Sequence, residues 1–221
     1  MKKLLLTISV FCFLLPINTY GQDINKDIFQ ELFNYAYTAH QNSMRHCNII
    51  PEKNKNLLNT MKTLEKKARE KTSSAFNTMN EAVTLLRMLQ EQIEKVCGKV
   101  ALVDESTIKT IIANEAGILI SSYKGSGNFK GFLSEVYETE YSKLLYILTM
   151  GKDLGEMHVK WAEIMSAKRK NPDDAIKNVR KANRYLAEEI RKQIFLMETY
   201  YEGKELKIPE KKEDGEKKSS D

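Results

Sequence analysis

The stretch of sequence that decides the fold is residues 52–97, EKNKNLLNTMKTLEKKAREKTSSAFNTMNEAVTLLRMLQEQIEKVC. Apolar and small residues recur in it at steps of three and four, like the residues on one face of a helix: Leu57, Met61, Leu64, Ala68, Thr72, Ala75, Met79, Ala82, Leu86, Leu89, Ile93 and Val96. The one irregularity is a second consecutive step of four, from Ala68 to Thr72, which is typical of a stutter in a heptad pattern. We therefore expect one continuous, heptad-like helix about 68 Å long, packed against other long helices as in a coiled coil.

Cys47 and Cys97 lie at the two ends of this predicted helix. A disulfide requires Cα atoms within about 7 Å of each other, so a continuous helix excludes a bridge within the chain. A bridge becomes possible only if the chain folds back near residues 71–74, KTSS, which are polar but include neither glycine nor proline. The sequence favours the continuous helix and leaves the oxidation state of the two cysteines open.

Other helices are predicted before and after the long one, over about 24–47, 104–123, 129–151, 154–165 and 171–203. We expect the first to end near Cys47, and Gly98 and Gly151 to mark the ends of two others. Asp104 or Ser106 is expected to cap the helix that follows Gly98. The run NPDD at 171–174 combines a cap, a proline in the first turn and acidic residues that face the helix dipole.

The composition agrees with a helical fold. The chain has 221 residues, of which ten are glycine and four are proline. This number of turn residues is too small for an all-β sandwich, which needs them about every 8–12 positions. We expect an all-α fold, an elongated helical bundle over residues 22–203 built on the long helix with shorter helices around it. Residues 204–221 hold six lysines and six acidic residues, and they are predicted to form a disordered charged tail.

An export signal precedes the predicted bundle. Residues 1–3, MKK, are followed by the apolar run 4–15, by Pro16 and by small residues at Thr19 and Gly21, which is the pattern of a secretory signal peptide. We place the signal peptide at 1–21, so its removal lowers the formal net charge from +5 to +3. The apolar run is shorter than the ~20 residues that a membrane-spanning helix needs. The mature protein is expected to be periplasmic or extracellular, without a stable membrane anchor.

No metal or cofactor site is predicted. His46 and Cys47 are adjacent, so on a helix they point about 100° apart, and His40 and His158 do not complete the spacing that metal-binding helices use. The glycine-rich run GSGNFKG at 125–131 resembles a phosphate-binding loop but lacks the Gly-Lys-Ser/Thr ending. We interpret it as a turn between helices.

No set of a nucleophile and a base is recognisable, so we expect no enzymatic activity. An enzyme with an unfamiliar site is kept as a further hypothesis. The residues to test for it are Glu135, Glu138, Tyr141 and His158, because carboxylates, a phenol and an imidazole are the groups that acid–base chemistry uses.

Basic and aromatic residues offer two other kinds of surface. The basic runs at 66–71, 168–170 and 180–184 lie beside acidic residues, so we interpret them as solvated helix faces and expect no nucleic-acid partner. The aromatic residues are expected mainly in the core, and any that stay exposed are candidates for partner contacts: Phe129, Phe132, Tyr137, Tyr141, Tyr146, Trp161, Tyr185, Tyr200 and Tyr201.

The export signal, the long helix and the missing catalytic set together favour a non-catalytic structural or interaction protein of the bacterial cell envelope. In its layout the chain is similar to VirB5-type minor pilus proteins of type IV secretion and conjugation systems, which are exported helical proteins of about this size with long paired helices. This similarity implies other envelope or secretion proteins as partners, bound through helix–helix or aromatic contacts. The alternative is a periplasmic chaperone or adaptor, which would hold client proteins in a groove of methionine and aromatic residues.

Overall fold

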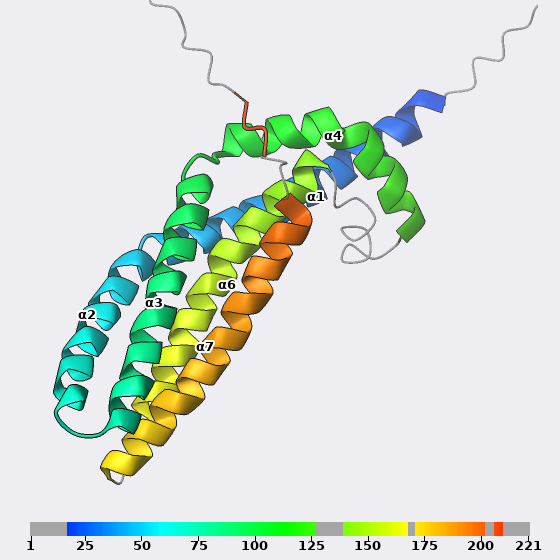
Figure 1. Ribbon diagram of the computed structural model, residues 1–221. Coiled ribbons are helices and arrows are strands. Elements are labelled where there is room, and N and C mark those ends of the chain that lie inside the picture. The colour runs from blue at the N-terminus through cyan, green and yellow to red at the C-terminus, as the bar shows by residue number, and fades with distance from the viewer. Residues whose placement is uncertain (1–16, 127–138, 168–170, 202–205, 210–221) are drawn as a thin grey trace, which may run out of the picture.

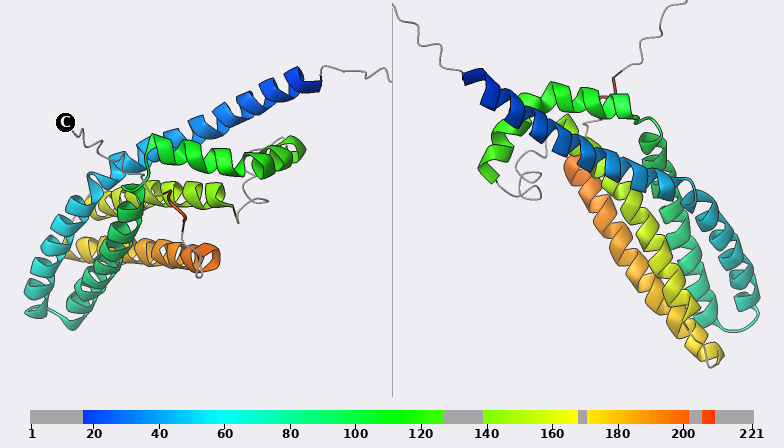
Figure 2. Two further views of the ribbon diagram at one scale, coloured as in Figure 1. Left: turned by 90° about the horizontal axis from the view of Figure 1, so that it is seen from above. Right: turned by 180° about the vertical axis from the view of Figure 1, so that it is seen from behind.

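Six helices make up the part of the chain that the computed structural model describes, residues 17–126, 139–167, 171–201 and 206–209. They are α1 (Ile17–Cys47), α2 (Ile50–Arg69), α3 (Ser73–Val100), α4 (Glu105–Ser126), α6 (Glu140–Ser166) and α7 (Pro172–Tyr201). Because no strand occurs within these ranges, the predicted all-α helical bundle is confirmed. Figure 1 shows α2, α3, α6 and α7 side by side. Figure 2 shows α1 and α4 running next to each other across one end of these four helices.

The continuous helix predicted over residues 52–97 is wrong, because α2 ends at Arg69 and the chain reverses before α3 begins at Ser73. Thr72 is extended, with φ −140° and ψ 149°, and its side-chain oxygen accepts a hydrogen bond of 3.1 Å from the backbone N–H of Ala75. Such a cap satisfies a backbone donor at the start of a helix and contributes about 1 kcal/mol. The step of four from Ala68 to Thr72 that resembles a stutter is thus the place where the helix breaks.

The two arms of the α2–α3 hairpin are held together by a polar contact inside the core. Asn54 on α2 is fully buried. Its Nδ2 donates to the backbone oxygen of Leu86 at 3.0 Å and to Oε1 of Gln90 at 2.9 Å, both on α3. A buried amide is costly unless it is hydrogen-bonded, so this contact favours one alignment of the two arms over the others.

A disulfide joins Cys47, the last residue of α1, to Cys97 in the last turn of α3, with Cα atoms 5.4 Å apart. The bridge is possible because the chain folds back between α2 and α3, which is the alternative that the sequence left open. The two cysteines are 50 residues apart in the sequence, and the whole of α2 lies between them. The disulfide therefore fixes the α2–α3 hairpin to the end of α1.

Glycines that resemble helix ends in the sequence lie inside helices. The prediction of two separate helices on either side of Gly151 is wrong, because α6 runs without interruption through Gly151 and Gly155. A Cβ atom at Gly151 would lie 1.9 Å from Oγ of Ser43, and one at Gly155 would lie 2.4 Å from Nδ1 of His46. Both neighbours belong to α1, so these glycines let α1 pack directly on the backbone of α6. Gly98 likewise lies within α3 and does not end it.

Three predicted helix boundaries are confirmed. The first helix ends at Cys47. The backbone N–H of Thr107 donates to Oδ1 of Asp104 at 2.8 Å, which makes Asp104 the cap of α4. In the same way, the backbone N–H of Asp174 donates to Oδ1 of Asn171 at 2.9 Å at the start of α7.

Part of the predicted tail packs on the bundle. Leu206 and Ile208 are half-buried against the core, and the backbone N–H of Lys207 donates to Oε2 of Glu140 at 2.8 Å. The predicted disorder is therefore wrong for these three residues. Apart from Pro209, the rest of the predicted tail lies outside the described residues. Among the residues that the structure describes, none of the helices is long and apolar enough to cross a membrane.

Removing the disulfide with Cys47→Ala and Cys97→Ala is expected to lower the free energy of unfolding by up to about 4 kcal/mol, because the unfolded chain is no longer closed into a loop of this length. Urea unfolding followed by circular dichroism measures the change. A reducing agent should shift the curve of the wild type toward that of the double variant and leave the variant's own curve unchanged. Identical curves for the two oxidised proteins would contradict the bridge.

Gly151→Ala is expected to lower the free energy of unfolding by about 1–3 kcal/mol, since the added methyl group overlaps Ser43, even though alanine has the better helix propensity. Gly98→Ala is the matched control. No atom lies within 4 Å of a Cβ at that position, so this substitution should raise stability by about 0.5–1 kcal/mol. Ser43→Ala should recover part of the loss in Gly151→Ala. Stabilisation by both glycine substitutions in urea unfolding would show that α1 does not pack on α6 in this way.

Candidate functional site

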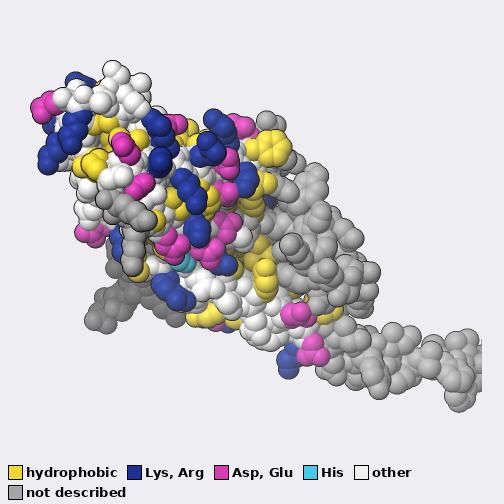
Figure 3. All heavy atoms as spheres, turned by 90° about the horizontal axis from the view of Figure 1, so that it is seen from below, with side chains coloured by type: hydrophobic (Ala, Val, Ile, Leu, Met, Phe, Trp, Pro, Cys, Tyr) yellow, Lys and Arg dark blue, Asp and Glu magenta, His cyan; other side chains and the backbone are white. Residues whose placement is uncertain are grey.

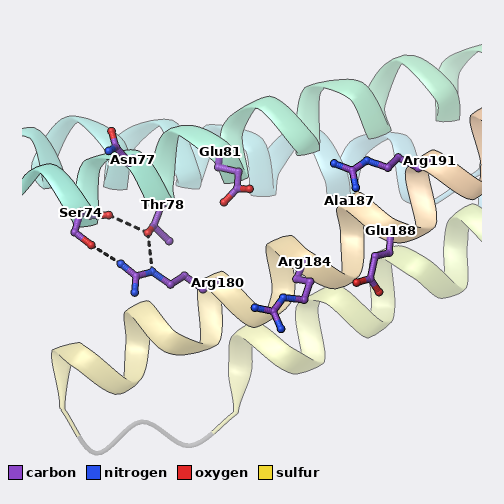
Figure 4. Close-up of a pocket in the computed structure, with 9 residues that line it drawn as sticks. All are labelled: Ser74, Asn77, Thr78, Glu81, Arg180, Arg184, Ala187, Glu188 and Arg191. Carbon is purple, nitrogen blue, oxygen red and sulfur yellow. Dashed lines mark hydrogen bonds between the residues drawn. The ribbon is translucent and has the colours of Figure 1, made fainter.

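A polar groove of about 820 Å³ lies between α3 and α7 and is open to solvent (Figure 4). Nine residues line it and define what we call the arginine groove: Ser74, Asn77, Thr78, Glu81, Arg180, Arg184, Ala187, Glu188 and Arg191. The three arginines follow one another along α7, beside the residues of α3 (Figure 4). Because they outnumber the two glutamates, the lining carries an excess of positive charge.

The groove follows from the way in which α3 and α7 pack. The core-facing residues of α7 recur at steps of three and four: Val179, Ala182, Leu186 and Ile190. Arg180, Arg184 and Arg191 recur at steps of four and seven, which places them along a neighbouring face of the same helix. The opposite wall is the start of α3, which lies beside α7 because the chain folds back at Thr72.

A buried amide ties the two walls together. Asn183 on α7 is 1% exposed. Its Nδ2 donates to the backbone oxygen of Thr78 at 3.0 Å and to Oε2 of Glu81 at 3.1 Å. The carboxylate of Glu81 therefore already has a partner within the protein, and the spacing of α3 and α7 along the groove is held by hydrogen bonds as well as by apolar packing.

Arg180 is held in place by neutral groups. Its Nε donates to Oγ1 of Thr78 at 3.3 Å, and its Nη2 donates to Oγ of Ser74 (Figure 4). Thr78 in turn donates to the backbone oxygen of Ser74 at 2.9 Å. These contacts fix the direction of the guanidinium group across the groove, and no carboxylate of a described residue pairs with its positive charge.

Arg184 and Arg191 are exposed and have neither an ion pair nor a hydrogen bond to any residue that the structure describes. The ion pairs between described residues all join lysine to glutamate about one turn apart on a helix: Lys109–Glu105, Lys143–Glu140, Lys152–Glu156, Lys160–Glu163 and Lys192–Glu189. Figure 3 shows basic and acidic side chains intermingled on the face seen from below. The arginines of the groove differ from this pattern, because none of them is paired with a carboxylate in the described part of the chain.

The residues considered for an unfamiliar enzyme site are not brought together where the structure describes them. Tyr141 and His158 both lie on α6, about 25 Å apart along its axis. The hydroxyl of Tyr141 is buried and donates to the backbone oxygen of Leu32 at 2.8 Å, and burial raises the pKa of Tyr141 well above its ordinary value. Burial also lowers the pKa of His158. Glu135 and Glu138 lie outside the described residues.

The cysteine and the histidines considered for metal binding take part in a disulfide or in helix packing. Cys47 is oxidised in the disulfide to α3, so it offers no thiolate. His46 lies against Gly155 where α1 meets α6. His40 is 8% exposed, and burial lowers its pKa although the nearby Asp104 carboxylate acts in the opposite direction. Among the described residues, no group of three histidine, cysteine or acidic side chains could hold a metal ion.

Trp161 and Tyr141 are fully buried, as expected of core aromatics, and Tyr146 and Tyr185 pack against the core. The remaining aromatic side chains of that set lie outside the described ones: Phe129, Phe132, Tyr137, Tyr200 and Tyr201. Phe195 on α7, which the sequence did not single out, is 65% exposed. Core packing therefore accounts for the described members of the predicted set.

The arginine groove could be found only in part from the sequence. The basic run at 180–184 is predicted as a solvated helix face, and nothing in that prediction singles out Arg191 or the wall on α3. A signal was present, because Arg180, Arg184 and Arg191 share one helical face. The partner helix was not predictable from the pattern, since the start of α3 reaches this position only after the chain reverses at Thr72.

Comparison with models of known protein families, with curated protein sequences and with solved structures finds no significant match to this chain. No likeness to a known protein therefore assigns a function to the arginine groove.

Proposed function

We propose that this chain is an exported, non-catalytic interaction protein of the bacterial cell envelope, and that it binds a partner through the arginine groove. The observation that carries the proposal of export is the disulfide between Cys47 and Cys97. Disulfides form and persist in oxidising compartments such as the periplasm, and they are rare in the cytosol. Removal of the predicted signal peptide, which contains Cys12, would leave these two cysteines as the only ones in the chain.

The start of α1 is compatible with removal of the predicted signal peptide, residues 1–21. Cleavage after Gly21 would remove the first five residues of α1, which begins at Ile17. The described core begins further along the helix, at Ile28. A chain that starts at Gln22 would therefore keep every core residue that the structure describes.

The lining of the groove favours polar recognition over the holding of apolar client segments. Its only apolar residue is Ala187. A periplasmic chaperone that holds clients through methionine and aromatic side chains would need an apolar groove instead. The observation therefore ranks an interaction protein above the chaperone alternative.

A component of a type IV secretion or conjugation apparatus is a narrower form of the same proposal. The paired helices α2–α3 and α6–α7 support it, because long paired helices are part of the similarity to VirB5-type proteins. The single long helix that strengthened the similarity at the level of sequence is absent, since residues 70–72 interrupt it.

Export is tested by expressing the full chain in a bacterium that has a periplasm and measuring its intact mass in each cell fraction. We expect a periplasmic chain that begins at Gln22 and resists alkylation until it is reduced. Leu6→Arg, which places a charge in the apolar run of the signal peptide, should keep the full-length chain in the cytosol with reactive thiols. A wild-type chain that stays in the cytosol with an intact N-terminus would refute the proposal.

A further inference from the structure

We infer that the arginine groove binds an acidic peptide segment of a partner protein, through carboxylate side chains that pair with Arg184 and Arg191. This inference rests on the proposed function, because it names the chemistry of the partner that the same groove would hold. It follows from the state of the three arginines, from the shape of the groove and from the chemistry that guanidinium groups prefer.

The arginines offer hydrogen-bond donors that the described chain leaves unused. A guanidinium group has five N–H donors in a fixed plane, a geometry that matches two oxygens of a carboxylate or a phosphate. Arg180 donates from Nε to Thr78 and from Nη2 to Ser74 and is thereby oriented across the groove. Arg184 and Arg191 have no such partners among the described residues. One arginine of the groove is therefore oriented by the protein, and the other two can pair with the carboxylates of a ligand.

The two glutamates of the groove form no ion pair with these arginines and offset only part of their positive charge. Glu81 accepts a hydrogen bond from the buried amide of Asn183, on the wall opposite Arg184. Glu188 lies one turn from both Arg184 and Arg191 on α7, yet it forms an ion pair with neither. An incoming carboxylate would therefore meet an excess of positive charge, while the two glutamates would disfavour a partner with many closely spaced negative charges.

The spacing favours a peptide over a small anion. Arg191 lies seven positions after Arg184, which corresponds to about 10 Å along the axis of α7. In an extended peptide, carboxylates two residues apart lie on the same face, about 7 Å from each other, a separation that two long arginine side chains can match. A single phosphate would contact both positions only if the two arginine side chains turned toward each other. The open, elongated groove of about 820 Å³ between two helices also has room for several residues of a peptide.

The test measures the fluorescence anisotropy of a labelled peptide of about ten residues, alternating Glu and Ser, with the purified, disulfide-bonded protein. We expect saturable binding that weakens as salt rises and is absent for the Gln and Ser counterpart. The double variant Arg184→Gln, Arg191→Gln should bind about ten-fold more weakly, because two charge-assisted pairs are lost. The matched control is Lys177→Gln, Lys181→Gln, which removes the same charge from exposed positions of α7 outside the groove and should change binding less than two-fold.

Three results would overturn the inference. Equal weakening by the two double variants would show that the peptide responds to net charge alone. Displacement by inorganic phosphate as readily as by unlabelled peptide would identify a small-anion site. Preferential binding to vesicles that contain anionic lipid would identify a membrane surface as the partner. All four substituted residues are exposed, so unfolding curves should confirm that both variants fold.

The export test and this binding test can fail separately. A chain that stays in the cytosol would refute export and leave this binding result unaffected.

Discussion

The reversal of the chain at Thr72 is the constraint on which the rest of the structure depends. It converts one long periodic stretch into two antiparallel arms, and the side-chain cap to Ala75 starts the second arm. The disulfide then fixes the far end of that arm to α1. Because α3 contacts α1, α6 and α7, the position of this one helix determines where most of the other helices lie.

Close approach and buried polar contacts define how the helices pair. The glycines at 151 and 155 allow α1 to lie on the backbone of α6. Asn54 selects the pairing of α2 with α3, and Asn183 that of α3 with α7. A shift of one helix against its neighbour would lower the stability of the fold, because a side chain would then overlap the neighbouring helix or an amide would stay buried without a partner. The arginine groove lies along the last of these contacts, so its walls have a defined spacing.

The periodic pattern predicted which residues form helices and many of those that are buried, such as Met61, Leu86 and Ile93, but Leu64 of the same pattern is 38% exposed. It located a possible break near residues 71–74 but could not decide whether the helix breaks there, because the steps from Ala68 through Thr72 to Ala75 fit both a stutter in one helix and a second helix that starts at a cap. Glycine was ambiguous for a related reason. Whether Gly151 ends a helix or admits a neighbour depends on where α1 lies, and periodicity within α6 holds no information about that. The arginine groove was therefore predictable only in part. The spacing of the arginines on α7 indicates one wall, whereas the wall on α3 reaches the groove only because the chain reverses.

The distance between spin labels at Lys53 on α2 and Glu91 on α3 tests the reversal most directly. Both side chains are exposed, and each is adjacent to a residue of the contact between Asn54 and Gln90. Two packed helices predict a label distance of roughly 15–25 Å, measurable by pulsed electron paramagnetic resonance on the disulfide-bonded protein. A distance near 57 Å, the value for 38 residues of uninterrupted helix, would contradict the reversal and with it the arginine groove.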